Sequence, residues 1–115
     1  MNGWDDPSIQ MSGRSPRIVF SPAAIHDLEE IVRYSLREWG SVRAKRYDSS
    51  LRQGILHLAH HPNLGQARPE FGQSIRSFSV ESHVVIYEAT DTDLIVLRII
   101  HPRQDVAEIM SEPDA

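Results

Sequence analysis

The sequence contains no cysteine among its 115 residues, which excludes a disulfide framework and any thiol chemistry. No stretch approaches the roughly 18 apolar residues of a membrane helix, and the acidic start, residues 1–7, lacks the apolar region of a signal peptide. A glycine-rich phosphate loop and a Ser/His/Asp arrangement are also missing. We therefore expect a cytoplasmic protein without a nucleotide loop or a hydrolase triad.

Lysine is nearly absent: Lys45 is the single lysine, and the other eleven of the twelve basic residues are arginines. The net charge is −4, but between Arg14 and Arg103 the twelve bases face only ten acids. Arginine is the residue best suited to bidentate pairing with carboxylate or phosphate. A body this weakly basic does not by itself predict a nucleic-acid binder.

Residues 94–100 form the most apolar segment, with six aliphatic residues in seven. A run this short, bounded by a Thr-Asp repeat and by His101-Pro102, predicts a strand buried on both faces. Arg98 is its only charged residue, and a charge in a core strand is costly unless it is paired or reaches solvent. Arg98 is therefore the first candidate for a functional role.

Two amphipathic helices are predicted before this strand. Ser21-Pro22 provides an N-cap and a first-turn proline for the first helix, which we expect to end near Gly40. Ser41 is predicted to cap the second helix, which stops before His61-Pro62. The apolar stripes are Ala24, Ile25, Leu28, Ile31, Val32, Ser35 and Trp39 on the first helix, and Ala44, Tyr47, Leu51, Ile55 and Leu58 on the second. The short joint predicts an αα-hairpin.

The remaining pattern predicts strands at residues 17–20, 75–80, 83–88 and 94–100, a loop at 63–73 and a final helical turn at 105–110. The fold class is therefore α+β, with a small antiparallel β-sheet packed against an N-terminal αα-hairpin in the order β-αα-βββ. Residues 1–16 read as a flexible N-terminal extension, 17–110 as one domain and 111–115 as a frayed tail.

Six short segments, taken together in this order, resemble a known family. They are Phe20-Ser21-Pro22-Ala23-Ala24 with Asp27-Leu28; Tyr34 with Trp39-Gly40; Leu58-Ala59 with Pro62-Asn63-Leu64-Gly65; Ile75-Arg76-Ser77-Phe78; Val85-Ile86-Tyr87; and Arg98-Ile99-Ile100-His101 with Asp105. The chain is similar, from about Ile18 to Asp105, to the RelE/ParE superfamily of toxins from type II toxin–antitoxin pairs. The long hairpin, the Pro-Xaa-Leu-Gly loop and the Arg-Ile-Ile-His ending resemble the ParE-like branch.

This resemblance implies a toxin that binds and inhibits DNA gyrase, without enzymatic activity or a cofactor, and that a ParD-like antitoxin neutralises in a hetero-oligomer. The RelE branch implies a different function, cleavage of messenger RNA on the ribosome. A third alternative is a member that has lost toxicity and only forms the complex.

A nuclease of the RelE kind would need clustered cations on the scissile phosphate and a group that moves a proton. Arg76, Arg98 and Arg103 are the candidates for the cluster, and Tyr87 or His101 for proton transfer. The resemblance also implies lysines before the strand meander and an aromatic or basic residue after its last strand. This chain has neither, and its residues 105–109 are acidic. The sequence therefore favours the non-enzymatic reading.

Candidate residues for contact with the target or the antitoxin are Arg76, Arg98, His101, Arg103, Trp39 and Tyr47. The arginines would pair with an acidic partner, and the aromatic side chains of the helical stripes would supply apolar anchors. A structural alternative is open for Arg76 and Arg98, each of which would brace the sheet by pairing with a carboxylate such as Glu88 or Asp105. For His101 we favour a strand-end cap over catalysis, and for Tyr87 a core aromatic with its hydroxyl at the rim.

His57, His60 and His61 lie close together in the sequence, and one helical turn separates His57 from His61. No nearby acid or cysteine completes a ligand set. We interpret them as a solvated helix end and predict no metal site.

Overall fold

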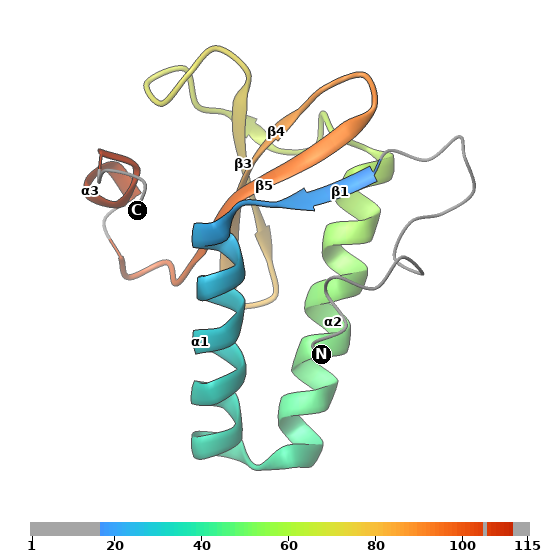
Figure 1. Cartoon of the computed structure of the whole chain (residues 1–115), viewed down its shortest axis with the longest axis vertical. Helices are drawn as coiled ribbons and strands as arrows, with labels where there is room; N and C mark the ends of the chain where they lie inside the picture. The colour runs from blue at the N-terminus through green and yellow to red at the C-terminus, as the bar shows by residue number, and fades with distance from the viewer. Residues whose placement is uncertain (1–16, 105, 112–115) are drawn as a thin grey trace.

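The computed structural model describes residues 17–104 and 106–111, and it builds them from two long helices, a short C-terminal helix and five strands (Figure 1). The predicted extension, 1–16, and positions 112–115 of the predicted tail lie outside the described residues. The strands are β1 (Arg17–Phe20), β2 (Gln66–Ala67), β3 (Ile75–Val80), β4 (His83–Ala89) and β5 (Asp93–Ile100). The helices are α1 (Pro22–Trp39), α2 (Ser41–His60) and α3 (Val106–Ser111). The predicted α+β fold is confirmed.

The sheet is mixed, with strand order β1-β5-β4-β3-β2. Strands β3, β4 and β5 form the predicted antiparallel meander, whereas β1 pairs parallel to β5, with Arg17 opposite Asp93 and Phe20 opposite Val96. The short strand β2 was predicted as loop; it forms because two residues pair with β3. The β4–β5 register shifts between Ile86 and Tyr87.

The helical hairpin begins where the sequence predicts. Ser21 caps α1, because its Oγ accepts a hydrogen bond from the Ala24 N–H at 3.0 Å, and the same hydroxyl donates to the Leu97 carbonyl on β5 at 2.7 Å. One expectation is wrong: Ser41 is the first residue of α2, and Gly40 occupies the cap position. Gly40 has a φ of 82°, which favours glycine and allows the two helices to follow each other directly.

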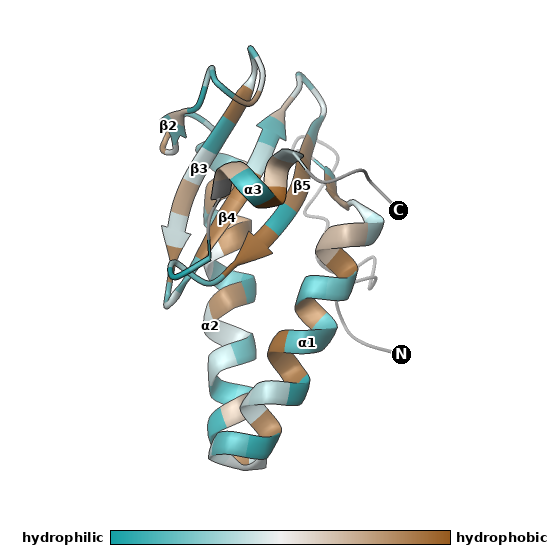
Figure 2. Ribbon diagram, turned by 90° about the vertical axis from the view of Figure 1, so that its left-hand side faces the viewer, coloured by the Kyte–Doolittle hydropathy of each residue, from teal (hydrophilic) through white to brown (hydrophobic). Residues whose placement is uncertain are grey.

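The core lies between the hairpin and one face of the sheet. Leu28 of α1, Leu51 and Ile55 of α2, and Val85 and Val96 of the sheet are all at most 2% exposed. The predicted stripe of α1 is only partly buried, and Val32 is 36% exposed. The turns of the hairpin nearest Gly40 extend beyond the sheet (Figures 1 and 2), although Ser35, which is nearer to Gly40 than Val32, is only 3% exposed.

Candidate functional site

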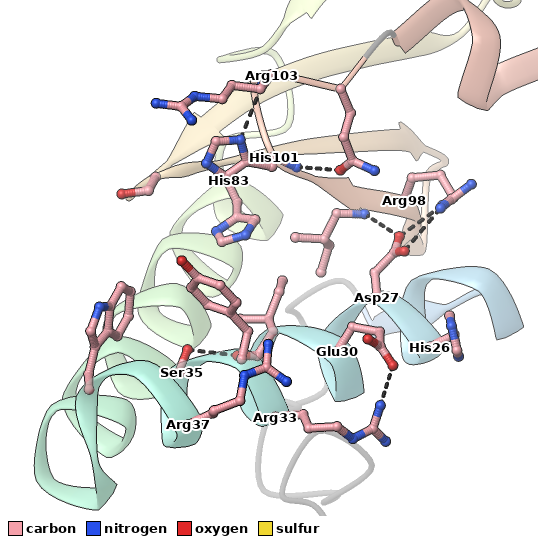
Figure 3. Close-up of a pocket in the computed structure, with 16 residues that line it drawn as sticks. His26, Asp27, Glu30, Arg33, Ser35, Arg37, His83, Arg98, His101 and Arg103 are labelled. Atoms are coloured by element: carbon pink, nitrogen blue, oxygen red, sulfur yellow. Dashed lines mark hydrogen bonds and ion pairs between the residues drawn. The ribbon is translucent and has the colours of Figure 1, made fainter.

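A groove of about 760 Å³ opens between one side of α1 and the ends of β4 and β5 (Figure 3). Its lining residues are His26, Asp27, Glu30, Ile31, Arg33, Tyr34, Ser35, Arg37, Trp39, Ser82, His83, Arg98, Ile99, His101, Arg103 and Gln104. Four of them are arginines, three are histidines and two are acids, so the lining carries more positive than negative charge. Five come from the last strand and the turn that follows it.

Asp27 joins α1 to the end of β5 within this groove. Its carboxylate accepts hydrogen bonds from Arg98 Nε at 2.8 Å, from Arg98 Nη2 at 3.0 Å and from the Ile99 backbone N–H at 2.9 Å. The Asp27 side chain is 11% exposed and that of Arg98 is 21% exposed. A largely buried, bidentate pair of this kind braces the fold and fixes the direction of β5. Asp27 is thus a carboxylate partner of Arg98 that was not predicted from the sequence, and Asp105, one of the two predicted examples, lies outside the described residues.

A second connection links α2 to the groove through Tyr47 and His83. The Tyr47 hydroxyl lies 2.6 Å from His83 Nδ1 and accepts the Ser82 backbone N–H at 3.0 Å. The His83 ring meets the His101 ring edge to face, with 5.9 Å between centroids. Burial, followed by the nearby His101, lowers the pKa of His83 from its usual range, and burial raises the pKa of Tyr47. The neutral imidazole is thus favoured in the folded protein.

Aromatic contacts continue along the hairpin from Tyr47. Trp39 lies edge-on to Tyr47 with 5.6 Å between ring centroids, and Tyr34 lies edge-on to Trp39 at 6.1 Å. The Arg43 guanidinium covers the Trp39 ring at 4.5 Å. The predicted anchors Trp39 and Tyr47 therefore belong to one aromatic wall beside the groove.

Arg76 and Tyr87 form a separate network at the other end of the sheet. Tyr87 is fully buried; its hydroxyl donates to the Pro62 carbonyl at 2.6 Å and accepts the Gly65 N–H at 2.9 Å. Arg76 Nη1 donates to the Gly65 carbonyl at 2.7 Å. Burial raises the pKa of Tyr87. Tyr87 is thus a core aromatic as expected, although its hydroxyl binds the 62–65 loop instead of lying at an open rim.

The sequence of the chain matches one family of known proteins. The family model described as the ParE toxin of the type II toxin–antitoxin system parDE matches residues 18–106. The chain belongs to the ParE toxin family. Toxin ParE1 of Mycobacterium tuberculosis is 37% identical over 93 residues, which cover 80% of this chain and 95% of that protein. Toxin ParE of Escherichia coli is 32% identical over 89 residues, which cover 76% and 86% of the two chains.

A solved structure shares the fold of this ParE family member. The structure titled "Chromosomal ParDE TA system from P. aeruginosa" superimposes with a TM-score of 0.64 at 18% sequence identity, covering 76% of this chain and 97% of the other. The predicted ParE-like branch of the toxin superfamily is therefore confirmed by the family model and the relatives, and the solved structure confirms the fold.

In this ParE family member the three arginines predicted for a RelE-like cation cluster are divided, because Arg98 and Arg103 line the groove and Arg76 does not. Arg76 is opposite Tyr87 in the β3–β4 register, and Arg98 is opposite Ile86 in the β4–β5 register. Paired residues share a face and consecutive strand residues alternate, so Arg76 and Arg98 lie on opposite faces of the sheet. Of the predicted residues, Arg98, His101, Arg103 and the aromatic wall meet at the groove, whereas Arg76 and Tyr87 do not.

His101 belongs to a tight turn after β5. Its backbone N–H donates to Gln104 Oε1 at 2.8 Å, its carbonyl accepts the Gln104 N–H at 2.9 Å, and its Nδ1 accepts the Arg103 N–H at 3.1 Å. This turn presents the exposed side chains of His101 and Arg103 at the groove. His101 therefore stabilises the turn at the end of β5 and also lines the groove.

The three histidines near the end of α2 lie away from the groove. The His57 and His61 rings are 4.8 Å apart, and His60 Nδ1 bonds to the Leu56 carbonyl. Across residues 17–104 and 106–111, no group of three or more His, Cys, Asp or Glu side chains is placed to hold a metal ion. Within the same residues, no helix has the length and apolar character needed to cross a membrane.

Tyr87→Phe tests the loop network. The change deletes one oxygen and leaves the Gly65 N–H and the Pro62 carbonyl without this partner in a buried place, so we expect the free energy of unfolding to fall by about 1–3 kcal/mol. Urea unfolding of Tyr87→Phe and of Tyr34→Phe, whose side chain is exposed, measures the difference. Equal stability of the two variants would contradict this account.

Proposed function

We propose that this chain is the toxin of a ParDE-type pair, that it inhibits DNA gyrase by binding it, and that it performs no catalysis of its own. Membership of the ParE toxin family over residues 18–106 carries the proposal. The separation of Arg76 from Arg98 supports the non-enzymatic reading, because a phosphate cannot meet both guanidinium groups at once. This function assigns the protein to the cytoplasm, where gyrase acts.

We further propose that a ParD-like antitoxin neutralises the toxin in a hetero-oligomer. The arginine-rich groove supports an acidic tail as the bound segment, and the aromatic wall supports apolar anchors beside it. The surplus of cations in the lining remains after the two pairs within it, Asp27 with Arg98 and Glu30 with Arg33, are set aside, because Arg37 and Arg103 also line the groove. Arg37 has a carboxylate partner at 3.5 Å in Glu38, which does not line the groove.

A supercoiling assay tests the gyrase proposal. Purified gyrase, relaxed plasmid and ATP are incubated with the toxin, with the toxin after saturation by its antitoxin, and without either. We expect the free toxin to abolish supercoiling and to accumulate cleaved plasmid, and we expect the antitoxin to restore supercoiling.

Unchanged supercoiling, from protein shown to be folded and to arrest growth, would contradict gyrase inhibition. Mapped cuts in translated messages would then support the ribosomal nuclease alternative. Harmless overexpression of folded protein would instead support a member that only forms the complex.

A further inference from the structure

His83 and His101 differ from the other groove residues in one respect. In each ring, Nδ1 is hydrogen-bonded within the described protein and Nε2 is not. Arg103 donates its backbone N–H to His101 Nδ1 at 3.1 Å. A backbone N–H is only a donor, so His101 Nδ1 is unprotonated and the neutral ring carries its hydrogen on Nε2.

Tyr47 fixes His83 in the same tautomer. The Tyr47 oxygen already accepts the Ser82 N–H, which directs its hydroxyl hydrogen to His83 Nδ1 at 2.6 Å. His83 therefore also presents an Nε2–H donor. Among the described residues, neither Nε2 atom has a hydrogen-bond partner.

These two donors lie in a groove whose surplus of charge is positive, and the two rings contact each other edge to face (Figure 3). A carboxylate has two oxygens, accepts hydrogen bonds only and carries the opposite charge. We propose that His83 and His101 form a carboxylate-binding subsite, which, if the proposed function holds, receives an acidic side chain of the antitoxin. A neutral amide has one acceptor oxygen in place of two and carries no negative charge, so we expect it to bind more weakly.

Binding at this subsite is linked to protons. In the free protein burial and the neighbouring His101 lower the pKa of His83, while Asp27 of α1 raises it. A bound carboxylate adds a negative charge and raises this pKa, so binding takes up a proton. The affinity for the carboxylate therefore increases as the pH falls from the raised pKa of His83 in the complex toward its lowered pKa in the free protein. The other charged or titratable groups that face this corner are Tyr47 and its neighbour Glu81, together with Arg37, Arg98 and Arg103.

The first experiment uses acetate as the probe of the free, full-length protein. Imidazole nitrogens are followed by NMR between about pH 5.5 and 7.5 in sodium acetate and in sodium chloride of equal ionic strength. We expect acetate to shift the Nε2 signals of His83 and His101 and to raise the pKa of His83, without an effect on His57. Equal shifts in the two salts would overturn the subsite.

The second experiment measures antitoxin affinity at several pH values for His83→Gln and His101→Gln, with His57→Gln as a control outside the groove. Glutamine at position 83 keeps an acceptor for Tyr47, and thermal melts verify folding. At about pH 6 we expect the first two variants to bind the antitoxin roughly tenfold more weakly, which corresponds to a change of about one unit in the pKa of a histidine on binding. We also expect the affinity of His83→Gln to depend less on pH.

Wild-type affinity in both variants would overturn the assignment of the subsite to the antitoxin. If the wild-type toxin binds acetate at the histidines but does not bind the antitoxin, the proposed neutralisation fails while the carboxylate subsite stands.

Discussion

Replacing Asp27 with asparagine is expected to lower the free energy of unfolding by about 3 kcal/mol, because it breaks a largely buried ion pair from one side. The Asp27 carboxylate accepts three hydrogen bonds, two from Arg98 and one from the Ile99 N–H. Asparagine has one acceptor oxygen and no charge, so it cannot satisfy the same donors. Urea unfolding, with the transition midpoint and slope fitted together, measures the loss.

Arg17→Gln provides the matched control. Arg17 pairs with Asp93 at 3.2 Å, but its side chain is 60% exposed. Solvent screens such a pair, and its removal should cost less than about 1 kcal/mol. Equal losses for Asp27→Asn and Arg17→Gln would mean that the Asp27–Arg98 pair does not brace the fold.

Gly65→Ala is the second change with a large expected effect, a loss of about 3 kcal/mol. Gly65 is buried, and a Cβ there would overlap the Tyr87 hydroxyl and crowd the Ser77 carbonyl of β3. The overlap forces the tyrosine or the loop to move, which adds the cost of overpacking to the loss of the buried hydrogen bonds. Chemical denaturation compared with the wild-type protein measures the effect.

A double mutant separates these two contributions. Tyr87→Phe removes the oxygen that the new methyl group would meet, so Gly65→Ala should cost less in the Tyr87→Phe background than in the wild type. Strictly additive losses would show that the costly clash is with the ring of residue 87 or with the Ser77 carbonyl and not with the tyrosine hydroxyl.

The sequence predicts those parts of the fold that depend on neighbouring residues. Ser21-Pro22, Gly40 and His61-Pro62 set the helix boundaries through capping and proline sterics, which act within one turn. The strands at 75–80 and 94–100 follow from alternation and a short apolar run. The short joint between the two apolar stripes predicts the αα-hairpin, and its packing on the sheet is confirmed by the core that the two share.

Contacts between distant segments could not be predicted in the same way. The carboxylate that pairs with Arg98 is 71 residues away, and no local pattern distinguishes Asp27 from the other acids of α1. The opposite orientations of Arg76 and Arg98 depend on two registers and a shift between them. Tyr47 and His83, which sequence reasoning did not connect, meet only after the hairpin packs.

The pairing of β1 with β5 has a consequence for synthesis on the ribosome. The first and last strands are joined along the sheet edge, and Ser21 and Asp27 bond to Leu97, Arg98 and Ile99. A nascent chain can form the α1–α2 hairpin early from local contacts. The groove beside α1 still lacks one side of its lining until the residues after β5 leave the exit tunnel. Because His101 and Arg103 follow β5 in the chain, the lining of the groove is completed only after the last strand of the sheet has been synthesised.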